Sequence, residues 1–177
     1  METATRRPRT GTLPLLLAGL EAGMLGVLFM LAWLGLSAKM QGRSFWTAEN
    51  LMASTFYGGR AIRSGFAQRT LSGLALYLLL YSTLGAVFAA LLSDRLPRFR
   101  ILLLSVVFAL GWYYLAFHVI WRSLAPLMVL LYSAQPMILG HLVYGTFLGR
   151  YPAHVPKAIM EPAAAPAALE PAGPDAG

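Results

Sequence analysis

Residues 71–92 read LSGLALYLLLYSTLGAVFAALL, and no charged side chain interrupts them. At the 1.5 Å rise of an α-helix, such a stretch reaches across the hydrocarbon core of a bilayer, which is ~30 Å thick. A helix also satisfies its own backbone hydrogen bonds, which a chain in lipid must do. The stretch therefore predicts a membrane-spanning helix.

Three more apolar stretches of spanning length occur, at residues 12–38, 101–121 and 124–148. Together the four predict an all-α fold, a four-helix transmembrane bundle that occupies residues 12–149. Only a few residues connect the third and fourth stretches, so we expect these two helices to form an antiparallel hairpin.

The composition agrees with a membrane protein and excludes several kinds of site. Of the 177 residues 58% are hydrophobic and 12% are charged, and the mean hydropathy is +0.62. The net charge is +7, but the basic residues lie beside the apolar stretches, where they favour anionic lipid headgroups over nucleic acid. The chain has no cysteine, which excludes disulfides, thiolate metal sites and cysteine nucleophiles.

The two ends of the chain differ in character. Residues 1–11 form a basic segment with Arg6, Arg7 and Arg9, and the apolar run after it is too long for a typical signal peptide, so we expect a retained helix. Residues 150–177 are rich in proline and alanine, which predicts a disordered tail. Basic residues number eight on the side of the termini and six on the other, which favours cytoplasmic termini in a bacterial inner membrane.

The loop at residues 39–70 contains the amphiphilic segment TAENLMASTFYGG. We expect a short helix here that lies at the membrane interface, with Thr47 as its N-cap. A re-entrant hairpin remains an alternative, because the glycines of this loop permit tight turns at membrane depth. The residues expected at the interface or against lipid, in the loop and elsewhere, are Trp46, Arg60, Arg63, His118 and Trp121.

Small residues recur at helical spacing in the predicted spans, which is typical of close helix packing in lipid. They predict packing faces rather than ligand grooves. The glycines that carry this prediction are Gly19, Gly23, Gly26, Gly85, Gly145 and Gly149.

Polar side chains inside the apolar stretches are costly and so mark candidate functional positions. The buried polar candidates are Glu21, His141, Gln135 and Tyr81. Glu21 and His141 lie at similar depth from the same side, and we expect them to share a hydrogen bond or an ion pair. Pro136, beside Gln135, predicts a kink in the fourth helix.

No nucleophile–base set, phosphate-binding loop or metal-ligand cluster is recognisable, so we expect no enzymatic activity, no metal and no cofactor. Haem held by His118 and His141 is not expected, because the two would differ in depth by roughly 20 Å.

The stretches GRSFWTAENLMASTFYGG and TLSGLALYLLLYSTLGAVFAALL resemble small bacterial membrane proteins of unassigned function that have four predicted helices. The resemblance implies a four-helix bundle and no particular binding residue. The leading functional hypothesis is a non-enzymatic protein that acts by helix association, as a homo-oligomer or an accessory subunit of a membrane complex. The alternative is a small transporter or ion-conducting protein with a polar path near Glu21, Gln135 and His141.

Overall fold

The computed structural model describes residues 12–62, 65–92 and 96–155, and every regular element within these residues is a helix. The predicted all-α class is therefore confirmed. The helices are α1 (Thr12–Met40), α2 (Thr47–Tyr57), the 3-10 turn η1 (Gly58–Arg60), α3 (Gln68–Leu91), α4 (Arg98–Leu115), the π-helical turn η2 (Ala116–Ile120), α5 (Trp121–Leu124), α6 (Pro126–Leu131), α7 (Ala134–Leu148) and the 3-10 turn η3 (Tyr151–His154).

Among the described residues, three helices are long and apolar enough to cross a membrane. These are α1, α3 and the continuous helix Arg98–Leu124, which comprises α4, η2 and α5. Their bounds agree with three of the predicted spans to within a few residues. The three helices support a membrane location for the protein.

The fourth predicted span, residues 124–148, is not one helix, and here the prediction was wrong. Tyr132 and Ser133 adopt extended backbone angles, with ψ of 137° and 131°, and separate α6 from α7. In a continuous helix the ring of Pro136 would clash with the carbonyl of Tyr132, four residues earlier. The extended Tyr132 turns that carbonyl aside, and Pro136 falls in the first turn of α7, where its missing N–H has no helical partner to lose.

Polar side chains from other elements satisfy backbone groups around this break. Arg43 donates from Nη1 to the carbonyl of Leu131 at 2.8 Å, and Trp33 donates from Nε1 to the carbonyl of Pro136 at 3.0 Å. An irregular backbone at membrane depth needs such partners. The break is therefore held by contacts with α1 and with the segment that follows it.

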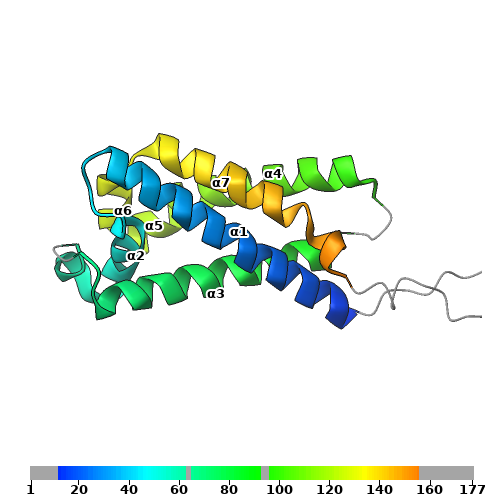
Figure 1. Ribbon diagram of the computed structural model, residues 1–177, viewed down its shortest axis with the longest axis horizontal. Helices are drawn as coiled ribbons and strands as arrows, with labels where there is room; N and C mark the ends of the chain where they lie inside the picture. Colours follow the sequence, from blue (N-terminus) through cyan, green and yellow to red (C-terminus); the bar gives the residue numbers. More distant parts are fainter. Residues whose placement is uncertain (1–11, 63–64, 93–95, 156–177) are drawn as a thin grey trace, which may run out of the picture.

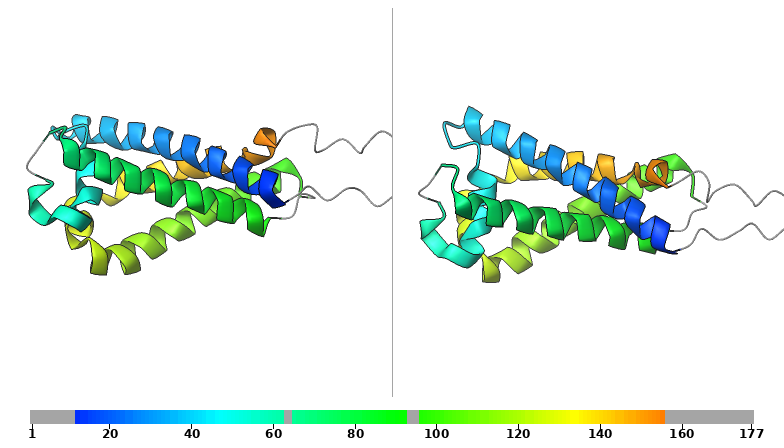
Figure 2. Two further views of the ribbon diagram at one scale, coloured as in Figure 1. Left: turned by 90° about the horizontal axis from the view of Figure 1, so that it is seen from below. Right: turned by 60° about the horizontal axis from the view of Figure 1, so that its bottom comes forward.

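The long helices lie side by side in the order α3, α1, α7, α4 (Figure 1). α1 packs along both α3 and α7, and α7 also packs along α4. Toward the end that holds α2, the α4–α5 helix diverges from α3, and α2 and α6 lie in this part of the molecule (Figure 2). The described chain begins and ends at the opposite end (Figure 1).

Glycines make the helix contacts close, as predicted. Gly19 of α1 and Gly85 of α3 face each other so closely that a Cβ on either would overlap the carbonyl oxygen of the other. A Cβ on Gly23 would lie 2.7 Å from the carbonyl oxygen of Tyr81. The remaining predicted glycines also pack within the chain, Gly26 against Tyr144, and Gly145 and Gly149 against α4.

The expected helix in the first loop is present as α2, but its expected cap was wrong, and the helix is buried against its neighbours. Residues Thr47–Ser54 are all buried, and α2 packs against α3 so that a Cβ on Gly73 would overlap the carbonyl oxygen of Glu49. The N-cap is Trp46, and the Thr47 hydroxyl donates to the carbonyl of Ser44 instead. α2 is therefore packed among other helices at one end of the molecule, and its depth relative to a membrane stays a prediction.

Asn50 and Thr70 attach α2 to the start of α3. The Thr70 hydroxyl donates to Asn50 Oδ1 at 2.7 Å and accepts from the N–H of Ala67, while Asn50 Nδ2 donates to the carbonyl of Gly65. These bonds fix the orientation of α2, and with it the position of Glu49.

The first residues of the predicted disordered tail are ordered. Residues 151–154 form η3, which packs on α1, and Tyr151 and Val155 are buried. The aromatic ring of Tyr151 contacts that of Phe88 and anchors this segment. The predicted basic segment 1–11 and residues 156–177 lie outside the described residues.

Candidate functional site

Glu49 is a carboxylate buried inside the bundle end, with 2% of its surface exposed. Its Oε2 atom makes no hydrogen bond to any of the described residues. Burial raises the pKa of Glu49 from 4.5 to about 7, against a smaller opposing effect of its own backbone N–H. A carboxyl group with this pKa exchanges a proton near neutral pH.

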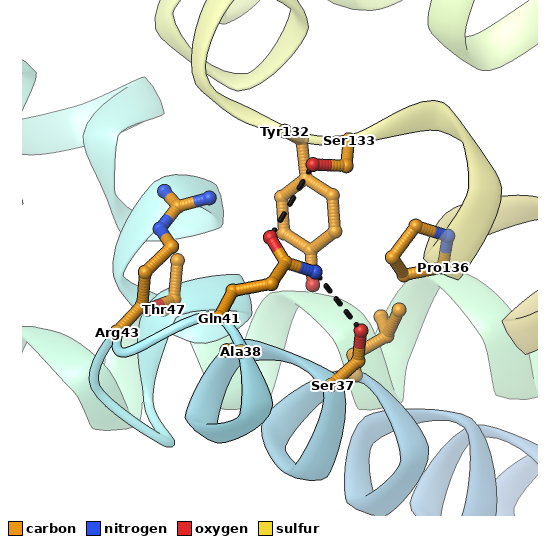
Figure 3. Close-up of a pocket in the computed structure, with 9 residues that line it drawn as sticks. Ser37, Ala38, Gln41, Arg43, Thr47, Tyr132, Ser133 and Pro136 are labelled. Carbon is orange, nitrogen blue, oxygen red and sulfur yellow. Dashed lines mark hydrogen bonds between the residues drawn. The ribbon is translucent and has the colours of Figure 1, made fainter.

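The hydroxyl groups of Tyr77 and Tyr132 lie close enough to Glu49 to interact with its charge. Tyr77 is fully buried on α3, and its hydroxyl makes no hydrogen bond within the described part of the chain. Tyr132 points from the helix break into the interior (Figure 3) and also interacts with the positive charge of Arg43. The packing supports the proximity to Tyr77, because the backbone of Glu49 lies against Gly73, one helical turn before Tyr77 on α3.

His141 lies deeper in the bundle, on α7, and both of its ring nitrogens have partners. Nδ1 is 2.7 Å from the carbonyl oxygen of Met137, and Nε2 is 2.8 Å from the hydroxyl of Tyr81. A carbonyl only accepts, so Nδ1 carries the proton. In the neutral ring Nε2 then accepts the hydrogen of Tyr81, and the tautomer is fixed by these two contacts.

Glu49, Tyr77, Tyr81 and His141 form one connected group, which we call the polar column. Tyr77 and Tyr81 are one helical turn apart on α3 with ring centroids at 5.8 Å, and the rings of Tyr81 and His141 are 5.7 Å apart. The indole N–H of Trp112 lies near Tyr81 and has no hydrogen-bond partner among the described residues. Unpaired polar atoms inside a membrane bundle are costly, which makes the polar column the strongest site candidate.

Two cavities lie near the helix break, lined by Thr47 and Asn50 of α2 but by no member of the polar column. A small cavity at this break has a volume of about 10 Å³ and is lined by residues of α1, the α1–α2 connection and the break itself, including Arg43, Tyr132 and Ser133 (Figure 3). The amide of Gln41 bridges Ser37 and Ser133 across it. An adjoining cavity of about 160 Å³ is lined by Arg43, Ser44, Thr47, Asn50 and Ile62.

Two of the four predicted buried polar residues, His141 and Tyr81, are buried and bonded to each other. The other two predictions were wrong. The Glu21 side chain is 55% exposed and pairs with His154 of η3 at 3.2 Å, not with His141. At 100° per residue Glu21 lies on the side of α1 opposite the small residues that face α3, and Gln135 is exposed at the start of α7.

Glu49 was missed because the loop was interpreted as a surface element. The apolar residues Ala48, Leu51, Met52 and Ala53 give only a weak signal, because polar residues are interspersed with them along α2.

The residues predicted at the interface divide into exposed and buried positions. Arg60 and His118 are exposed, Trp46 is half-buried against Phe45 and Phe66, and Trp121 is buried. Arg63 lies outside the described residues. Their location at a membrane interface stays a prediction.

The predicted separation of His118 and His141 was too large. Both rings pack against Tyr113, with centroids at 6.4 Å and 5.2 Å, so they lie closer than the roughly 20 Å expected from helix rise. The break before α7 changes the depth of His141 relative to a continuous helix. His141 nevertheless offers no free nitrogen to an iron, because both nitrogens are engaged. The described residues hold no cluster of three or more metal-ligating side chains.

Replacing Tyr81 with phenylalanine is expected to lower the free energy of unfolding by about 1–3 kcal/mol, because Nε2 of His141 is then buried without a donor. The measurement is thermal or denaturant unfolding in detergent. Tyr114→Phe is the matched control, since Tyr114 is 65% exposed. Equal stability of the two variants would contradict the structural role of the Tyr81–His141 bond.

No protein-family model, curated protein or solved structure matches the chain.

Proposed function

We propose that this protein is a small multi-pass transporter or conducting protein, in which the polar column provides the path for a small polar species. The observation that supports this most is the set of buried, unpaired polar atoms on neighbouring residues, Glu49 Oε2 and the Tyr77 hydroxyl. Polar and ionisable groups inside membrane bundles mark ion and substrate pathways more often than structural contacts.

The broken helix α6–α7 adds support. Discontinuous helices commonly line the sites of transporters, because their free backbone groups and altered side-chain directions face a polar interior. Here Tyr132 of the break interacts electrostatically with Glu49 and lines the cavity at Arg43. In this proposal α6 and α7 together make the fourth crossing of a bacterial inner membrane, with both termini in the cytoplasm. A periplasm-specific reporter that is active when fused after Gly177 would contradict this orientation.

The proposal is tested with the purified full chain in liposomes. We expect vesicles that contain the protein to pass at least one of protons, K⁺, Na⁺, Cl⁻ or a small neutral solute such as glycerol faster than protein-free vesicles. Tyr81→Phe is expected to reduce the flux several-fold, whereas Tyr114→Phe leaves it unchanged. Permeability equal to that of empty vesicles for all of these probes would refute the proposal.

Association with a partner is the second candidate, and the exposure of α4 favours it. Among the long helices α4 makes extensive contact with α7 alone, and Leu103, Val107 and Tyr114 are exposed. The glycine faces, in contrast, are used within the chain and so do not support an oligomer.

The absence of cysteine makes this candidate easy to test. A Val107→Cys variant carries a single thiol, and we expect it to cross-link in native membranes to a second copy or to a larger subunit. Leu79→Cys, on an exposed face of α3, is the matched control. Equal and weak cross-linking at both positions would exclude α4 as an association face.

A further inference from the structure

The cavity at the helix break, beside Tyr132, has room for little more than water. Its volume of about 10 Å³ corresponds to about one water molecule. The larger cavity of about 160 Å³ lies at the Arg43 end, outside the polar column. A solute or a hydrated ion needs a wider passage, whereas a proton moves by exchange between hydrogen-bonded groups and needs only a chain of them.

The members of the polar column can each donate and accept a hydrogen. A protonated carboxyl group and a phenol do both, and a neutral imidazole donates from one nitrogen and accepts at the other. In the structure Tyr81 donates to Nε2 of His141, so the last contact of the chain is already formed at 2.8 Å. The Glu49 and Tyr77 oxygens that are free of hydrogen bonds provide the open positions at the other end.

Glu49 is the member best placed to exchange a proton with the exterior. The titratable and charged groups that interact with it electrostatically are Tyr77 on α3 and Tyr132 at the break, and Tyr132 also interacts with Arg43. The other charged groups on the elements around α2 are the basic residues Lys39, Arg60 and Arg69, and Glu21 in the opposite half of α1. No second carboxylate of the described residues competes with Glu49 for a proton, and burial keeps its pKa near neutral pH, at about 7.

We infer that the species carried by the polar column is the proton, with the Glu49 carboxyl as the group that takes it up and releases it. This rests on the proposed transport function and names its substrate. Glu49 receives a proton from the Arg43 end and gives one to the Tyr77 side, with water molecules bridging groups that do not touch. At the far end Tyr81 passes its hydrogen to Nε2 of His141 and takes one from the Tyr77 side. His141, whose Nδ1 keeps its bond to Met137, passes the proton on to water, so one proton moves and no bond between heavy atoms changes.

The test measures proton flux into liposomes that contain the full chain, with a pH-sensitive dye inside and a K⁺ diffusion potential set by valinomycin. We expect Glu49→Gln to reduce the proton flux at least tenfold. Glu21→Gln makes the same chemical change on the exposed side of α1 and is expected to keep the wild-type rate. His141→Gln is expected to lower the flux as well, because it removes the terminal acceptor.

The outcomes separate this inference from the proposed function. Wild-type vesicles that pass a solute or another ion but no protons would overturn the inference and leave transport standing. Vesicles that pass none of the probes would overturn both. Proton flux that is equal in wild type and Glu49→Gln, with the variant still folded by its unfolding temperature in detergent, would remove Glu49 as the carrier.

Discussion

Gly85→Ala is expected to lower the free energy of unfolding by about 3 kcal/mol. The added Cβ would overlap the carbonyl oxygen of Gly19 and lie 2.9 Å from the Cα of Gly23. Both obstacles are backbone atoms of α1, which cannot rotate away as a side chain can. The helices must separate, and the long α1–α3 contact loosens along its length.

Gly111→Ala is the matched control for this substitution. Gly111 lies within α4, but nothing lies within 4 Å of the position of its Cβ, so we expect a stability within about 1 kcal/mol of wild type. Unfolding in detergent, followed by loss of helical signal, compares the two variants. If both unfold at the same temperature as wild type, α1 and α3 do not approach each other as closely as the structure has them.

Glu49→Gln is expected to remove a pH dependence of stability that the wild-type protein shows between pH 4.5 and about 7. The carboxyl titrates near 4.5 when the chain is unfolded, and burial raises its pKa to about 7 in the folded state. Between these values the folded protein binds more protons than the unfolded chain, so stability falls as the pH rises. The contribution is fully present below pH 4.5 and lost above about pH 7, and it amounts to about 3 kcal/mol.

The difference between the stability–pH profiles of wild type and Glu49→Gln gives the contribution of Glu49 separately from that of other titrating groups. The Gln variant is expected to be more stable than wild type at pH 8 and nearly equal to it at pH 4.5, since an amide resembles the protonated carboxyl. Glu21→Gln provides the control, because an exposed carboxylate should leave the wild-type profile in place. A wild-type profile parallel to that of Glu49→Gln would show that Glu49 is not desolvated.

The apolar stretches were sufficient to predict the long helices, because length and hydrophobicity are local properties of the sequence. The positions of α1 and α3 followed directly, and so did the glycines that line their contact. A distortion of this helix was predicted from Pro136, but its position at Tyr132 was not. A proline was known to disturb the helix, yet the chain separates four residues earlier, where the carbonyl that opposes the proline ring must turn away.

The candidate site was predicted only in its deeper half. His141 and Tyr81 lie in apolar stretches and were identified because burying a polar side chain in lipid costs free energy. Glu21 lies equally far inside an apolar stretch, but the rotation of α1 turns its side chain outward to pair with His154. The burial of Glu49 could be predicted only if the packing of α2 between other helices were known. That packing depends on contacts of Asn50, Thr70 and Gly73 between residues far apart in the sequence.

The interruption between α6 and α7 bears on how the chain is inserted during synthesis. Insertion of a lone segment needs about 20 consecutive helical apolar residues, and neither piece reaches that length. We expect this part of the chain to enter the bilayer only as a pair with α4, along which α7 packs. Ribosome-bound intermediates that end shortly after Leu148 should then be retained in the membrane only when α4 is present.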